Sequence, residues 1–126
     1  MMVNYDSVDG EDIDEIKNLL LYRKIVEVHL NNEMTGTMVL DDGTNLRIVS
    51  NEGCGGCGNG WYYLDELNKC DNVITNVELV YDVRNYDEVI QIFVYAEDTR
   101  IKAIEVSGDE GNGYYGRGFT IFVEKP

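Results

Sequence analysis

The sequence predicts an α+β protein that is mainly β, with one N-terminal helix followed by six or seven antiparallel strands. Three observations predict this fold: helical spacing of apolar residues near the N-terminus, alternation of apolar and polar residues from residue 23 onward, and connections of hairpin length. Such a chain forms a meander or Greek-key sheet, which must curl into a barrel or sandwich to bury its apolar face. We expect a single domain over 1–126, with an acidic segment at 1–22 and a β domain at 23–126.

The helix is expected between Asp9 and Tyr22, after about ten frayed residues. Asp9 is placed to cap the helix, and the acidic residues that follow suit the positive end of the helix dipole. The apolar residues at helical spacing are Ile13, Ile16, Leu19 and Leu20.

Strands are expected wherever apolar residues alternate with polar ones. In RKIVEVHLN, the apolar residues at 26, 28 and 30 would share one face, opposite residues 25, 27 and 29. Asp42-Gly43 lies between two alternating runs and predicts a hairpin with strands near 35–41 and 44–50. The remaining strands are expected at 73–82, 88–98, 99–108 and 118–125, and WYYL at 61–64 is only a candidate for a further short strand.

The net charge of −14, from 24 acidic and 10 basic residues, argues against duplex nucleic acid and anionic membranes as partners. An acidic surface either keeps the protein soluble or imitates DNA and occupies a basic protein. No apolar run is long enough to cross a bilayer, and the N-terminus is acidic where a signal peptide is basic. We therefore expect a cytoplasmic protein.

Two glycine-rich stretches are the candidate functional segments: NEGCGGCGNGWYYL at 51–64 and SGDEGNGYYGRGF at 107–119. Closely spaced glycines permit positive φ angles and let the backbone approach a ligand or another strand. They are equally compatible with tight turns or bulges between strands.

The first stretch also carries Cys54 and Cys57, and Cys70 follows thirteen residues later. The three thiolates are candidate zinc ligands, with His29 or a carboxylate as the fourth. Two alternatives are a redox pair, which the intervening glycines disfavour, and cysteines that pack as small hydrophobic residues.

The second stretch adds chemistry suited to a nucleotide. Aromatic rings stack on a base, a guanidinium binds phosphate, and amides between glycines form an anion site. The candidate ligand-binding residues are Trp61, Gly111, Asn112, Gly113, Tyr114, Tyr115 and Arg117, with Arg47 added because its strand leads into the first stretch.

Catalysis finds little support in the sequence. It contains no nucleophile elbow and no HExxH motif, and His29 is the only histidine that could act as a base near neutral pH. We therefore expect a protein that is not an enzyme and has no cofactor other than a candidate zinc ion.

Four stretches resemble a family of small, functionally uncharacterised proteins of bacteriophages and prophages: NEGCGGCGNGWYYL, LNKCDNVITNVE, FVYAEDTRI and GDEGNGYYGRGF. The resemblance covers roughly residues 24–124 and carries no activity that can be transferred to individual residues. It implies an accessory protein that acts in an infected bacterial cell, where such proteins often antagonise host defence.

The leading hypothesis is an oligomeric protein that sequesters a small nucleotide-type immune signal of the host without chemistry. One alternative is an acidic interaction protein or DNA mimic that blocks a host defence protein. A second alternative is a β module stabilised by zinc. The first hypothesis requires the two glycine-rich stretches to meet in space.

Overall fold

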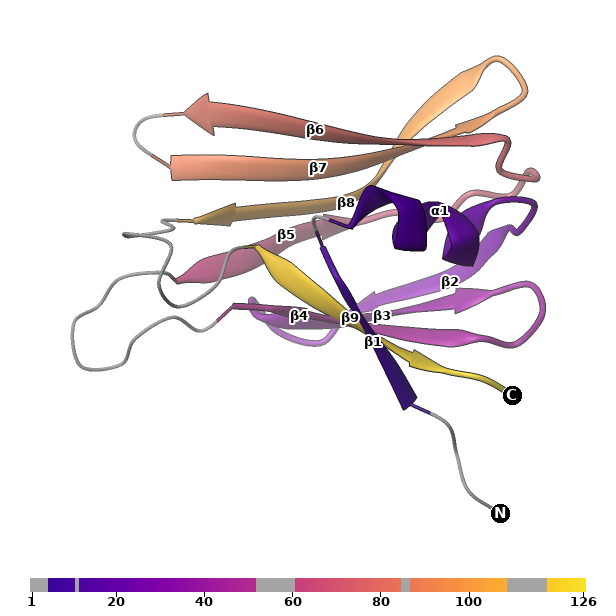
Figure 1. Ribbon diagram of the computed structural model, residues 1–126, viewed down its shortest axis with the longest axis horizontal. Helices are drawn as coiled ribbons and strands as arrows, with labels where there is room; N and C mark the ends of the chain where they lie inside the picture. Colours follow the sequence, from indigo (N-terminus) through magenta and orange to yellow (C-terminus); the bar gives the residue numbers. More distant parts are fainter. Residues whose placement is uncertain (1–4, 11, 52–60, 85–86, 109–117) are drawn as a thin grey trace.

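Two antiparallel sheets pack face to face in a computed structural model (Figure 1), which describes residues 5–10, 12–51, 61–84, 87–108 and 118–126. The first sheet has five strands in the order β1-β9-β4-β3-β2, and the second has four in the order β5-β8-β7-β6. The arrangement is a sandwich rather than a closed barrel, which decides between the two forms that the sequence predicted.

The five-stranded sheet contains the first and the last described strands of the chain. Its strands are β1 (Tyr5–Asp9), β9 (Phe119–Glu124), β4 (Asn45–Ser50), β3 (Thr35–Leu40) and β2 (Ile25–Leu30). The β3–β4 hairpin turns at Gly43, whose φ of +89° favours glycine, so the Asp42-Gly43 turn is confirmed.

The four-stranded sheet is joined to the first along β5. Its strands are β5 (Tyr62–Leu67), β8 (Thr99–Gly108), β7 (Asp87–Ala96) and β6 (Asn76–Arg84). On the side of β5 away from β8, the Leu64 amide donates to the Glu33 carbonyl at 2.7 Å. After the strand ends, Cys70 and Ile25 exchange two backbone hydrogen bonds. These bonds tie β5 and the segment after it to the first sheet.

Helix α1 (Ile13–Leu20) lies between the two sheets (Figure 1) and packs against β6. Ile16 and Leu20 are fully buried there. The cap is Asp12 rather than the predicted Asp9, because the Asp12 carboxylate accepts a hydrogen bond from the Glu15 amide at 3.2 Å. No described helix is long and apolar enough to cross a bilayer.

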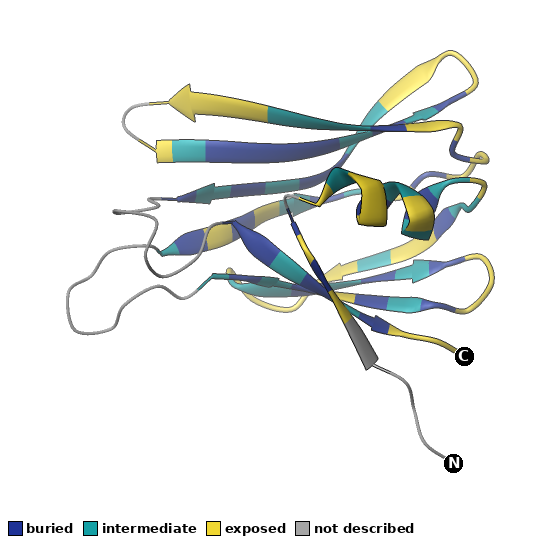
Figure 2. Cartoon of the chain, viewed as in Figure 1, coloured by how far each residue is buried: buried dark blue, intermediate teal, exposed yellow. Residues whose placement is uncertain are grey.

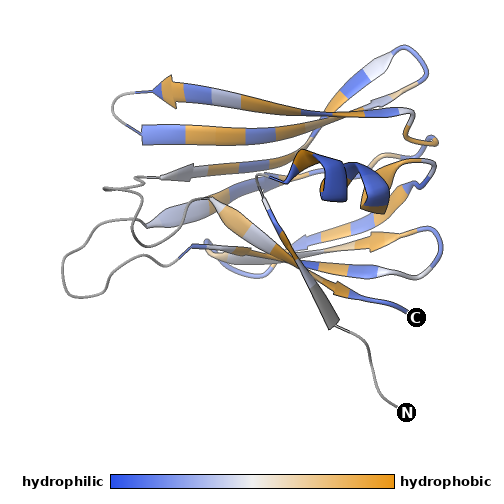
Figure 3. Cartoon of the chain, viewed as in Figure 1, coloured by the Kyte–Doolittle hydropathy of each residue, from blue (hydrophilic) through white to orange (hydrophobic). Residues whose placement is uncertain are grey.

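The core follows the predicted alternation of residues in most strands (Figures 2 and 3). In β4, for example, Leu46 and Ile48 are buried while Arg47 between them is exposed. Strand β7 departs from this pattern, because Gln91 on its outer face is also buried. Its amide donates to the Glu105 carboxylate at 2.8 Å, so burial leaves that donor satisfied.

Three sequence predictions need correction. The strands number nine among the described residues, not six or seven, and one of them, β1, lies in the segment expected to be frayed. In β2, a bulge between Ile25 and Glu27 breaks the alternation, so Ile25 is fully buried while Val26 is 43% exposed. The other predicted strands are present, with boundaries shifted by at most three residues.

Candidate functional site

Within the two glycine-rich stretches, residues 52–60 and 109–117 lie outside the described residues, and we call them the glycine-rich segments. The described residues that flank these segments meet at one end of the sandwich. Asn51 and Trp61 bracket the first segment, and Gly108 and Gly118 bracket the second. The Asn51 amide donates to the Gly118 carbonyl at 2.8 Å, and the Asn51 carbonyl accepts from the Tyr62 amide at 2.9 Å. Tyr62 in turn pairs with Gly108 across β5 and β8. We call this group of flanking residues, Asn51, Trp61, Gly108 and Gly118, the loop end.

Close backbone packing at the loop end requires glycine at two positions. A Cβ atom on Gly108 would lie only 2.1 Å from the Trp61 carbonyl oxygen. Gly118 has a φ of +72°, and a Cβ atom there would lie 2.6 Å from Ile90 Cδ1. These glycines hold the flanks of the two segments against the core, where a larger residue would force them apart.

Polar contacts beneath the loop end join three strands. The Tyr62 side chain is fully buried, and its hydroxyl donates to Glu88 Oε2 on β7 at 2.8 Å. The Ser50 hydroxyl lies 2.9 Å from the Tyr62 carbonyl oxygen and 3.1 Å from that of Met34, and it can donate to either. These hydrogen bonds connect the strands that carry the flanking residues, an arrangement that suits a binding site carried by loops.

Most of the predicted ligand-binding residues lie outside the described residues. These are Gly111, Asn112, Gly113, Tyr114, Tyr115 and Arg117, and the same holds for the predicted zinc ligands Cys54 and Cys57. Trp61 is among the described residues; it directly precedes β5 at the loop end and is partly buried.

Arg47 lies elsewhere. It projects from the outer face of β4 into a hollow of about 290 Å³ that Thr37, Asn45, Phe122 and Glu124 also line. Asn45 begins β4 and Glu124 ends β9, whereas the glycine-rich segments follow β4 and precede β9. The hollow thus extends toward the opposite end of the sheet from the loop end.

Cys70 and His29 lie apart from the loop end as well. Cys70 follows the far end of β5 and is 1% exposed, with its thiol donating to the Asn72 carbonyl at 3.3 Å. His29 is exposed on β2, and its Nε2 atom lies 2.7 Å from Glu27 Oε1. Within the described residues, no three His, Cys, Asp or Glu side chains are grouped so that they could hold a metal ion.

A hollow of about 250 Å³ on the outer face of the four-stranded sheet was not predicted from the sequence. Three carboxylates line it, those of Asp65, Asp87 and Glu105, together with Arg84. Burial raises the pKa of Asp65, and repulsion from Glu105 adds to this, against a hydrogen bond from Ser107 that lowers it. The three carboxylates come from three strands, so sequence spacing gave no signal of the cluster.

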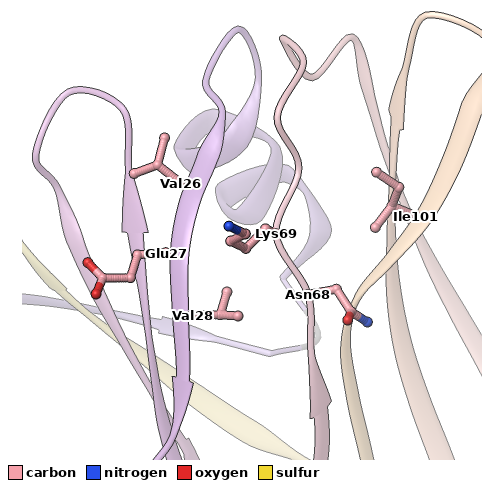
Figure 4. A pocket seen from close by; sticks show the side chains of 6 residues that line it. All are labelled: Val26, Glu27, Val28, Asn68, Lys69 and Ile101. Carbon is pink, nitrogen blue, oxygen red and sulfur yellow. The ribbon is translucent and has the colours of Figure 1, made fainter.

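A larger hollow of about 690 Å³ lies where β2 faces the segment after β5. Figure 4 shows Lys69 beside Val26 and Val28, with Ile101 on the far side of the hollow. The Glu27 carboxylate points away from it (Figure 4). This hollow combines apolar walls with one ammonium group, and none of the residues predicted to bind a ligand lines it.

Comparison with known proteins assigns the chain to a family whose activity is not known. No curated protein and no solved structure shows significant similarity to it. One family model, described as a domain of unknown function (DUF7448), matches residues 18–121. The match covers strands β2 to β8 in full, the first half of β9 and the last three residues of α1. It includes both glycine-rich segments and the loop end. The chain belongs to this family of domains of unknown function.

Proposed function

We propose that the protein binds and sequesters a small nucleotide-type ligand at the loop end, without catalysing a reaction. The observation that carries the proposal is the pair of contacts Asn51–Gly118 and Tyr62–Gly108, which bring the flanks of both glycine-rich segments together. The two segments therefore begin and end beside one another, which supports a shared ligand site.

The segments carry the groups that such a ligand requires. Trp61, Tyr114 and Tyr115 stack on a base, and Arg117 pairs with phosphate. The backbone amides of Gly111 and Gly113, with the Asn112 side chain, donate to anionic oxygens. Local donors of this kind offset the repulsion that the net charge of −14 exerts on an anion.

The biological role that fits this chemistry is that of a phage accessory protein. The sequence motifs resemble those of phage and prophage proteins, and sequestration requires binding alone. In this role the protein acts as an oligomer in the cytoplasm of an infected bacterium and removes a nucleotide signal made by a defence system.

Native mass spectrometry of the full chain tests the proposal. The protein is mixed separately with linear, cyclic mono- and cyclic dinucleotides, and bound masses are read directly. Tyr115→Ala and Arg117→Ala are expected to abolish the bound mass, because each removes one of the proposed contacts. The matched controls are Tyr22→Ala, at an exposed tyrosine after α1, and Arg100→Ala, at the far end of β8.

Binding that survives both loop substitutions would contradict the proposed site. The absence of a bound mass with every nucleotide class would contradict the proposed ligand. Loss of binding in the control variants to the same extent would also contradict the site, because those residues lie away from the loop end.

A second candidate function is that of an acidic protein, or DNA mimic, that blocks a basic host protein. The hollow lined by Asp65, Asp87 and Glu105 favours it, because the carboxylates of Asp65 and Asp87 suit a lysine or arginine side chain. Glu105 is already paired within the protein, with Lys102 at 3.2 Å and Arg84 at 3.9 Å. This candidate predicts a protein complex that weakens steeply with salt and is insensitive to Tyr115→Ala. A complex that is insensitive to salt would exclude it.

A further inference from the structure

Strand β6 is the outermost strand of the four-stranded sheet, and no described strand pairs with its outer edge. On the inner side, the odd-numbered residues of β7 pair with the even-numbered residues of β6. The Tyr95 carbonyl of β7 accepts from the Thr75 amide at 2.7 Å, so the odd residues of β7 turn their backbone groups toward β6. The odd residues of β6 therefore turn theirs to the outer edge, and the Val83 amide there donates to the Asp82 carboxylate at 2.9 Å. An edge of this kind accepts a further strand.

The side chains of the odd-numbered residues of β6 face the core, but those near its end are exposed. Val77 is 2% exposed, whereas Tyr81 is 42% and Val83 is 68% exposed. Helix α1 packs against β6 and ends near its start, where the Tyr22 amide donates to the Ile74 carbonyl. Figure 2 shows the end of β6 as exposed. Apolar side chains beside an open strand edge are typical of a surface that binds another protein chain.

The sequence of β6 is complementary to itself. If two copies pair antiparallel about a two-fold axis at Tyr81, Leu79 of each copy lies opposite Val83 of the other. These apolar side chains all lie on the inner face of the sheet. On the outer face, Glu78 of each copy lies opposite Arg84 of the other, so opposite charges meet.

The charges on β6 favour this register over its neighbours. Moving the axis by one residue places either Asp82 opposite itself or Glu78 opposite Asp82, and both arrangements oppose like charges. Within one chain Glu78 is paired with Arg100 at 2.7 Å, and Arg84 is paired with Asp82 at 2.9 Å. With the axis at Tyr81, contact between Glu78 and Arg84 joins these pairs into one network across the two copies.

We propose that a second copy of the chain binds along β6, so that the two four-stranded sheets form one continuous sheet. Leu79 and Val83 exchange backbone hydrogen bonds across the axis, and the Val83 amide leaves the Asp82 carboxylate to do so. Because β6 runs toward the loop end, an antiparallel partner has its own loop end at the opposite end of the joined sheet. The dimer therefore leaves both loop ends uncovered and does not depend on a bound nucleotide.

Sedimentation equilibrium of the full chain, without nucleotide, tests the association. We expect a monomer–dimer equilibrium that Val83→Lys weakens at least about tenfold, because the dimer would bury its ammonium group beside Leu79. Val26→Lys is the matched control, at a valine of the other sheet that is 43% exposed. A chain that stays monomeric up to about 1 mM, or a dimer that Val83→Lys weakens no more than Val26→Lys does, would overturn the proposal.

Cysteine cross-linking tests the register. Tyr81→Cys is expected to give a disulfide-linked dimer on oxidation with diamide, because residues paired at the axis have Cα atoms about 5.5 Å apart. Val83→Cys lies opposite residue 79 of the second copy and is expected to stay at the level of the unsubstituted chain, whose three cysteines set the background. A cross-link above background in Val83→Cys, or none in Tyr81→Cys, would overturn the proposal.

Discussion

Gly108→Ala tests whether the flanks of the two glycine-rich segments are packed as tightly as the structure indicates. The new Cβ atom would lie 2.1 Å from the Trp61 carbonyl oxygen and 2.6 Å from Tyr62 Cα, where ordinary contacts begin at 3.4 Å. Both neighbours are backbone atoms, so a side-chain rotation cannot relieve the clash. The start of β5 must move away from β8 by about an ångström.

The expected cost follows from two opposing effects. Forcing an extra methyl group into a packed region costs about 1–3 kcal/mol, while replacing glycine by alanine in a strand returns about 0.5–1 kcal/mol. We therefore expect a net destabilisation of about 1–2 kcal/mol, which lowers Tm by about 4–8 °C in a domain of this size.

Differential scanning calorimetry of the full chain measures this change. Thr99→Ala is the matched control, because Thr99 is exposed at the other end of β8 and its replacement should shift Tm far less. An unchanged or higher Tm in Gly108→Ala would mean that Trp61 does not lie against Gly108. The convergence on which the proposed function rests would then be wrong.

Three further predictions concern single groups. Tyr62→Phe is expected to lower the free energy of unfolding, measured in urea, by about 1–2 kcal/mol, because it removes the hydrogen bond to the Glu88 carboxylate. An unchanged free energy of unfolding would show that this bond is not made. Asp65→Asn is expected to stabilise the protein at neutral pH. Because folding raises the pKa of Asp65, its charged form costs stability above that pKa, and the gain should vanish as pH falls below the ordinary value of 3.8. If the stability gained by Asp65→Asn instead increased as the pH fell, the predicted direction of the Asp65 pKa shift would be wrong. EDTA is expected to leave Tm unchanged, because Cys70 packs in the core, and a fall in Tm would favour the zinc alternative.

The strands could be predicted because burial on one face produces a period of two in the sequence. Leu46 and Ile48 alternate with Arg47 in this way, and Gly43 marks the turn before them. Strand β1 escaped prediction because its sequence, YDSVD, has little alternation. Its place in the sheet comes from pairing with β9 at the other end of the chain.

The bulge in β2 could not be predicted from the sequence either. The pattern of residues 25–30 fits two registers, and only the pairing with β3 decides which apolar side chains turn inward. Local pattern predicts that a strand exists, whereas the facing strand determines which of its faces is buried.

The candidate sites were predictable only in part. Glycine content and aromatic residues identified the two segments from sequence, but the contacts between their described flanks depend on pairings between β4 and β9 and between β5 and β8, which are distant in the chain. The hollow around Arg47 likewise combines three strands.

The central claim, that a nucleotide-type ligand binds at the loop end, is tested most directly by NMR titration of the ¹⁵N-labelled full chain with the same nucleotide classes. The account predicts saturable shifts of the amide signals of Asn51, Trp61, Gly108 and Gly118, with the Asn45 signal unchanged. Saturable shifts confined to residues outside the two glycine-rich segments and their flanks, or no shift with any nucleotide, would contradict it.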